Sequence, residues 1–138
     1  MEVPVRRAAR RDSIEPLVLV ALDAVGATYE QLDLTDGPDL LVGHDGVNFL
    51  VELKSSLADV PTPGQVHWHN RWAGRVVYVC RTPQEVLARI GAPWTLEVRE
   101  AIAKHSAREY LAVLGPKARA KLMRGQGRLT SSVKRSAP

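Results

Sequence analysis

The sequence predicts one α/β domain in which a mixed sheet is flanked by helices. Three observations predict this class. The chain has 138 residues, of which 45% are hydrophobic and 25% charged, as in a single compact globular domain. Apolar runs of strand type alternate with stretches of helical spacing. A hairpin signal in the middle of the chain makes at least two strands antiparallel, so the sheet is expected to be mixed.

The first element is expected to be a helix. Apolar residues recur at helical spacing up to about Val25, where Gly26 ends the pattern. Asp12 or Ser13 can cap its N-terminus. A short strand is expected to follow at about residues 28–34.

The next two strands are expected to form a hairpin. Residues 40–42 and 47–53 are strand-like, and the Asp45-Gly46 pair between them is a strong turn signal. The fold-back is expected to pair Val42 with Val47 or Asn48 and to place the start of the first strand level with residues 51–52.

The second half alternates helices with one strand. Thr62–Gln65 has capping-box spacing, with proline at the first helical position, and predicts a helix through about Trp72. Residues 75–80 form a β-branched run that predicts a buried strand. The capping-box spacing recurs at Thr82 before a helix to Ile90, and a longer helix is expected from about residue 94 to 114, where Gly115 and Pro116 end it.

Three further features of this half are expected to be structural rather than parts of a metal site. Trp68 and Trp72 lie one helical turn apart and predict a packing face. His67 and His69 point to different faces of the same helix, with no cysteine nearby, which disfavours a zinc site. The single cysteine, Cys80, is expected to be a small buried hydrophobe, because it has no partner for an internal disulfide.

The net charge of +4 hides an asymmetry. Seven basic residues and no acid follow residue 116, so 12 basic residues remain against 15 acidic ones in the body, a net charge of −3. The seven are Lys117, Arg119, Lys121, Arg124, Arg128, Lys134 and Arg135. Such a segment suits a polyanion or is a solvated tail without a dedicated partner. We expect a domain over residues 1–116 and a basic, flexible tail over residues 117–138.

No apolar run approaches the roughly 20 residues that cross a bilayer, and no apolar segment of secretory type precedes Asp12. We therefore expect no membrane partner and a cytoplasmic location, in a bacterial or phage-infected cell.

Charged residues interrupt the predicted hairpin. Asp39 begins its first strand, and Glu52 and Lys54 lie on one face of its second strand, because side chains alternate along a strand. The fold-back brings the two carboxylates and the ammonium together. A divalent cation relieves the repulsion between such carboxylates, and Mg²⁺ prefers oxygen ligands. Lysine can then orient a water or offset charge on a phosphate, which is the composition needed for metal-assisted phosphodiester hydrolysis. A surface ion pair is the alternative reading.

These residues resemble a known signature. Pro38-Asp39 followed by Glu52-Leu53-Lys54 is similar to the PD-(D/E)XK nuclease superfamily. With Glu15 in the first helix, and with Gln65 and His69 in the helix that follows, the chain resembles the VRR-NUC family of virus-type replication-repair nucleases over residues 15–87. The resemblance implies a restriction-endonuclease-like three-layer sandwich. Acidic residues before Pro38 depart from the family pattern, and they would weaken DNA approach on that side or bind a second metal.

The resemblance also implies residue roles. Asp39, Glu52 and the carbonyl of Leu53 would bind Mg²⁺ or Mn²⁺, with Glu15 reaching the metal directly or through water. Lys54 would be the catalytic lysine, and Gln65 would position it or the phosphate. Within the resemblance, His69 would contact nucleic acid. Other contacts with nucleic acid are expected from basic side chains, and those of the tail lie outside the resemblance: Arg71, Lys117, Arg119, Lys121, Arg124 and Arg128. Two of these roles remain open on the sequence, because Glu15 and Gln65 both also stand at the third helical position of a capping box.

The function expected is a metal-dependent DNA endonuclease that acts on branched, junction or flapped DNA in replication, recombination or repair, as a homodimer. Two alternatives remain. One is a non-catalytic nucleic-acid-binding module of nuclease fold that serves as an accessory subunit. The other is a sequence-specific restriction enzyme, for which the chain is short of a dedicated recognition element.

Overall fold

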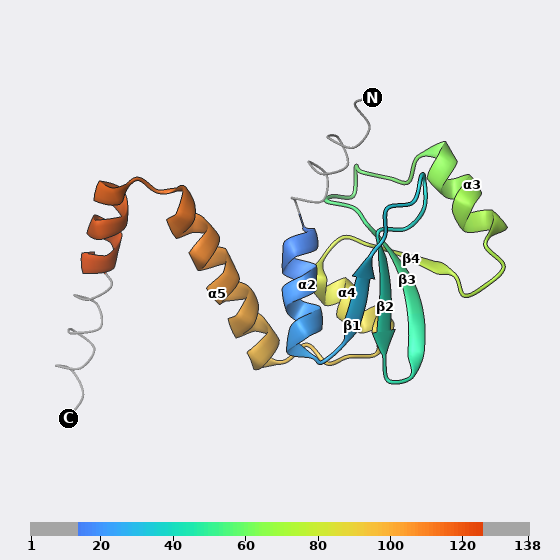
Figure 1. The fold of residues 1–138 in the computed structure, drawn as a ribbon, viewed down its shortest axis with the longest axis horizontal. Helices are drawn as coiled ribbons and strands as arrows, with labels where there is room; N and C mark the ends of the chain where they lie inside the picture. The colour runs from blue at the N-terminus through green and yellow to red at the C-terminus, as the bar shows by residue number, and fades with distance from the viewer. Residues whose placement is uncertain (1–13, 126–138) are drawn as a thin grey trace. The chain divides into compact units, whose positions relative to one another are not determined.

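The computed structural model describes residues 14–125 of the chain. Its elements follow in the order that the sequence predicts: helix, strand, hairpin, helix, strand, helix, helix (Figure 1). They are α2 (Glu15–Ala24), β1 (Thr28–Gln31), β2 (Leu40–His44), β3 (Val47–Leu53), α3 (Pro63–Arg71), β4 (Val77–Cys80), α4 (Pro83–Ile90) and α5 (Leu96–Val113). Residues 116–125 form a further helix. Asp12 and Ser13, the predicted caps of α2, lie outside the described residues; Ile14 occupies the N-cap position.

The four strands form one mixed sheet in the order β1-β2-β3-β4. β1, β2 and β3 are antiparallel neighbours, and β4 runs parallel to β3. The predicted hairpin register is wrong: Val42 pairs with Phe49, and His44 with Val47. The turn holds only Asp45 and Gly46, with φ of 51° and 78°. Two positive φ values make the tight turn whose twist matches that of the strands.

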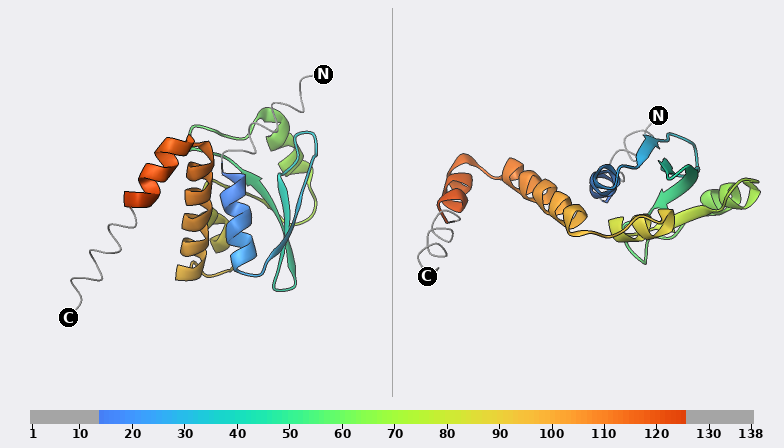
Figure 2. Two further views of the ribbon diagram at one scale, coloured as in Figure 1. Left: turned by 60° about the vertical axis from the view of Figure 1, so that its left-hand side comes forward. Right: turned by 90° about the horizontal axis from the view of Figure 1, so that it is seen from below.

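One face of the sheet carries the core. Leu40 pairs with Val51 and Val42 with Phe49, and all four side chains are buried. Helices α2 and α4 pack against each other on this side of the strands (Figure 2). Their buried apolar residues, with Ala27, Cys80, Ala92 and Val98, complete the core cluster.

The opposite face of the sheet is thinly covered. Leu41 and Leu50 point to this face and are only half-buried. α3 reaches it at the end where β3 stops, and α3 contains no buried residue. The predicted packing face of Trp68 and Trp72 is therefore wrong: Trp68 is half-buried and Trp72 is 44% exposed. The mixed sheet, with α2 and α4 packed together on one face, confirms the predicted α/β class and fits a restriction-endonuclease-like sandwich.

Both predicted threonine caps are present. Thr62 Oγ1 accepts from the Gln65 amide at 3.2 Å, and Gln65 Oε1 accepts from the Thr62 amide at 2.9 Å, so the capping box of α3 is complete. At α4, Thr82 Oγ1 accepts from the Glu85 amide at 3.0 Å. Satisfied N-terminal amides explain why both helices begin where the sequence predicts.

Cys80 is fully buried at the end of β4, as predicted. Burial, with a smaller effect of the Glu85 charge, raises the pKa of its thiol to about 11. Within residues 14–125, the helices are all too short or too polar to cross a membrane.

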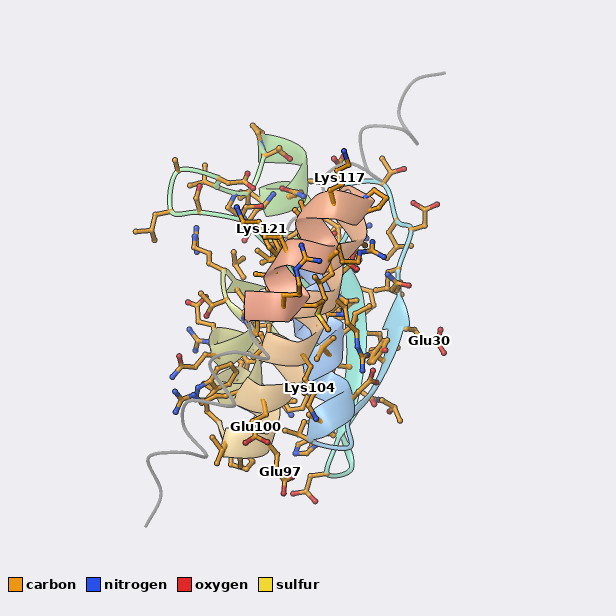
Figure 3. The ribbon with its side chains drawn as sticks, turned by 90° about the vertical axis from the view of Figure 1, so that its left-hand side faces the viewer. Glu30, Glu97, Glu100, Lys104, Lys117 and Lys121 are labelled. Carbon is orange, nitrogen blue, oxygen red and sulfur yellow. The ribbon has the colours of Figure 1, made fainter. Side chains whose placement is uncertain are left out.

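The chain divides into two compact units, Met1–Ala103 and Lys104–Pro138. In the second unit, the turn after α5 is held by Arg119, whose Nε and Nη2 donate to the Leu111 carbonyl at 3.1 and 2.6 Å. The part of the predicted tail that the structure describes, residues 117–125, is helical. Lys104 of α5 and Lys117 and Lys121 of the following helix are exposed in this unit (Figure 3).

Candidate active site

The open end of the β2–β3 hairpin brings Asp39 beside the Glu52–Lys54 segment. The Asp39 amide donates to the Val51 carbonyl at 2.9 Å, so β2 and β3 continue to pair beyond Leu40. Asp39 Oδ2 accepts from the Leu53 amide at 2.7 Å. This contact anchors the half-buried carboxylate of Asp39 at the level of Glu52, as the sequence predicts.

Glu52 is 1% exposed, and its Oε1 is buried without a hydrogen-bond partner in the described part of the chain. Burial, followed by the adjacent Asp39 carboxylate, raises the pKa of Glu52 to about 9, against a smaller lowering effect of Lys54. A buried carboxylate with an unsatisfied oxygen is costly unless a cation or donor occupies the site. The site is therefore suited to a positively charged ligand.

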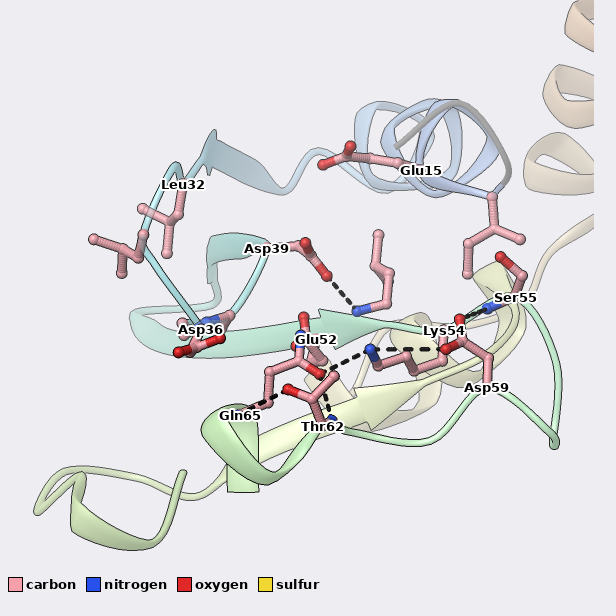
Figure 4. A pocket seen from close by; sticks show the side chains of 15 residues that line it. Glu15, Leu32, Asp36, Asp39, Glu52, Lys54, Ser55, Asp59, Thr62 and Gln65 are labelled. Atoms are coloured by element: carbon pink, nitrogen blue, oxygen red, sulfur yellow. Dashed lines mark hydrogen bonds and ion pairs between the residues drawn. The ribbon is translucent and has the colours of Figure 1, made fainter. Parts of the chain in front are cut away.

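Lys54 is the third member of the group and is 3% exposed. Its Nζ donates to Gln65 Oε1 at 2.9 Å and lies 3.9 Å from Asp59 Oδ1 (Figure 4). The same Gln65 oxygen accepts from the Thr62 amide, so a single atom serves both the capping box and the lysine. The ammonium is thus fixed from α3 and from the loop after β3.

Glu15 enters the same pocket from the first turn of α2 and is 3% exposed. Its carboxylate extends from α2 toward the side of the pocket where Asp39 lies (Figure 4). Among residues 14–125, no three His, Cys, Asp or Glu side chains come close enough to hold a metal by themselves. Glu15 therefore does not complete a set of three direct ligands with Asp39 and Glu52.

The two carboxylates of Asp39 and Glu52 are enough protein ligands for Mg²⁺. Mg²⁺ keeps several waters and commonly binds proteins through one or two carboxylates plus substrate phosphates. Asp39 and Glu52, with the Leu53 carbonyl, match that donor chemistry, and the unsatisfied Glu52 Oε1 points to the same conclusion. The residues present fit a hard divalent cation.

Two acids of the pocket were not assigned as site residues from the sequence. Asp59 pairs with Lys54 from a loop that no periodic pattern predicts. Asp36 belongs to the acidic stretch before Pro38 and lines the pocket. A Cβ at Gly64 would lie 2.7 Å from the Asp36 carboxylate, so this acid sits against the first turn of α3, where amide groups favour negative charge.

The residues predicted to contact nucleic acid lie in different surroundings, and one of them is outside the described residues. His69 Nε2 is buried without a partner among the described residues, and burial, followed by the Lys54 charge, lowers the pKa of His69. His69 does not line the pocket. Arg71 lies over the Trp68 ring, with its Cζ 5.4 Å from the ring centroid. Lys117, Lys121 and Arg124 are exposed on the helix of residues 116–125, Arg119 is used in the turn after α5, and Arg128 lies outside the described residues.

The fold and the pocket define an α/β domain with one buried and one half-buried carboxylate and a fixed lysine at the open end of a hairpin. Over 56% of its length, the chain is similar to a solved structure described as a VRR_NUC domain, at 27% identity and a TM-score of 0.47. The match covers 95% of that structure's chain. Its description is the family that the sequence motifs resemble. Neither the family models nor the curated proteins contain a match.

Proposed function

We propose that the protein is a metal-dependent nuclease that hydrolyses phosphodiester bonds in DNA. The observation that carries the proposal is the buried Glu52 side chain, whose unsatisfied Oε1 leaves a place for a cation beside Asp39. A fixed ammonium lies next to this carboxylate pair. A cation held by these carboxylates, together with the ammonium of Lys54, would stabilise the negative charge that develops when a phosphodiester is attacked.

Each side chain has a defined task in this proposal. Asp39, Glu52 and the Leu53 carbonyl would hold Mg²⁺ or Mn²⁺, which supplies Lewis-acid stabilisation of the phosphate when bound. The Leu53 amide keeps Asp39 in place through the 2.7 Å hydrogen bond. Lys54, held by Gln65 and Asp59, orients the attacking water or offsets charge on the phosphate.

Cleavage of labelled DNA tests the proposal. The substrates are four-way, flapped, splayed, single-stranded and plain duplex DNA, each with Mg²⁺, Mn²⁺ or EDTA. Native protein is expected to cut only with a divalent metal, and Lys54→Ala is expected to lose at least about 100-fold in rate, the scale of a positioned charge or proton-transfer group. Faster cleavage of the four-way or flapped substrate than of plain duplex DNA would identify branched DNA as the target.

Metal binding separates the nuclease from an accessory module that only binds nucleic acid. Mn²⁺ affinity is expected to fall in Asp39→Asn and to persist in Lys54→Ala, because the lysine is no ligand. DNA binding without metal binding, and without cutting on any substrate, would contradict the nuclease and favour the accessory module. Gel filtration with light scattering tests the expected homodimer.

A further inference from the structure

We propose that Trp72, stacked on Trp68, is a docking surface for an unpaired nucleobase, and that the strand entering the pocket is therefore single-stranded there. This inference rests on the proposed function and names its substrate class. The two indole rings are 4.9 Å apart between centroids and 13° from parallel. Trp72 is 44% exposed, at the C-cap of a helix with no buried residue, so core packing does not account for the pair.

The absence of a side chain at Gly74 leaves room for the Trp72 ring in this position. A Cβ at Gly74 would lie 2.7 Å from Trp72 Nε1, so any other residue there would push against the ring. Trp68 supports one side of the pair and packs near the loop before β2, because a Cβ at Gly37 would lie 3.3 Å from Trp68 Nε1. An exposed aromatic ring held in this way is what a stacked base requires.

The charge around the pair matches a polyanion. Residues 60–84 contain three arginines and no acidic residue. One of them, Arg71, lies over the Trp68 ring at 5.4 Å. A second copy of this chain is a poorer occupant, because two such basic segments would repel each other. An aromatic platform beside a cationic group is the combination that binds single-stranded nucleic acid.

The distance from the pocket to Trp72 is one that a single nucleic-acid strand can span. Gln65, which contacts Lys54, and Trp72 belong to the same helical segment. At 1.5 Å per residue, they are about 10 Å apart along the axis, roughly three nucleotides at stacked spacing. Bases inside a duplex have both faces covered by their neighbours, so only an unpaired or terminal base can stack on Trp72.

Binding measured without metal tests the surface. Fluorescence anisotropy of a labelled oligothymidylate is compared with that of an abasic oligomer of equal length and charge, using the full chain in EDTA. The native protein is expected to bind the oligothymidylate about fivefold or more tighter than the abasic strand, the scale of one stacked base. Trp72→Ala is expected to lose that difference, and Trp72→Phe to keep most of it.

The matched control is Tyr110→Ala, which removes another exposed aromatic ring, on α5. It is expected to leave the preference for bases unchanged. Equal affinity of the native protein for the two strands would overturn the inference, and so would a Trp72→Ala protein that still prefers the oligothymidylate. Equal native affinities would overturn the inference even if Trp72→Ala does not fold, and Trp72→Phe then tests whether an aromatic ring at this position is enough.

Cleavage in Mg²⁺ distinguishes this inference from the proposed function. Base-dependent binding through Trp72 with no cutting on any substrate would refute the nuclease and retain the stacking surface. Metal-dependent cutting with no effect of Trp72→Ala on base-dependent binding would refute the stacking surface and retain the nuclease.

Discussion

At the scale of single residues, Glu52 couples the pocket to the stability of the fold. The pKa of Glu52 is raised from 4.5 to about 9, mainly by burial. Below the ordinary pKa of 4.5, folded and unfolded chains both carry the protonated carboxyl. As pH rises from about 4.5 to about 9, only the unfolded chain ionises, so the metal-free fold loses stability across this range.

Glu52→Gln is therefore expected to stabilise the metal-free protein, because an amide resembles the protonated carboxyl and carries no charge. The increase in Tm is expected to be about 4 °C or more at about pH 8, and close to zero at about pH 4.5. Thermal unfolding followed by circular dichroism in EDTA measures it. Glu30→Gln makes the same change at an exposed position and is expected to have little effect. An equal shift at both pH values would contradict the explanation.

The residues of the pocket were predictable to different extents. Strand alternation and a hairpin turn place Asp39, Glu52 and Lys54 together, because both are properties of the local sequence. The role of Asp59 was not predictable, since its contact with Lys54 depends on the path of an irregular loop. The choice between a cap and a site role for Gln65 was open on the sequence, and the structure gives one oxygen both contacts.

At the scale of elements, α3 is held by its N-terminal cap more than by packing, since none of its residues is buried. Thr62→Ala removes the hydroxyl that accepts from the Gln65 amide. We expect a loss of about 1 kcal/mol in the free energy of unfolding. We also expect slower cleavage, because Gln65 and the ammonium that it holds become less well positioned.

Thr82→Ala is the matched control for this prediction, because Thr82 caps α4 in the same way. Both variants are expected to lose similar stability in denaturant unfolding, but only Thr62→Ala is expected to lose cleavage rate. Equal cleavage rates in the two variants would show that the cap does not position the site.

Element types and order were predictable, whereas the hairpin register and the face of α3 were not. Periodicity and capping boxes define where helices lie, so α3 and α4 begin as predicted. The register depends on how many residues the turn takes, and Asp45 adopts a positive φ that few residues tolerate. The spacing of Trp68 and Trp72 indicates a shared face, but it does not indicate whether that face is covered.

At the scale of the whole molecule, the core and the basic segment belong to different parts of the sequence. Every residue of the core cluster lies between Val18 and Val98, with Ile102 packed against it. A chain that ends at Gly115 loses seven basic residues and none of the core. Its Tm is therefore expected to match that of the full chain.

DNA binding by the shortened chain is expected to weaken and to depend less on salt. Each phosphate that the protein neutralises contributes about 0.9 to the slope of log affinity against log salt for duplex DNA. Loss of the basic segment should lower the slope by about 0.9 for each phosphate that these residues contact. Anisotropy titrations across a salt series measure it, and an unchanged slope would show that these residues do not contact phosphate.

The buried thiol of Cys80 can be used to measure how often the interior of the fold opens. Because the side chain is inaccessible and its pKa is raised to about 11, a disulfide reagent reacts only after β4 separates from its neighbours. The modification rate at neutral pH therefore reports how often the interior opens. Divalent metal is expected to slow that rate, because β4 pairs directly with the strand that carries Glu52.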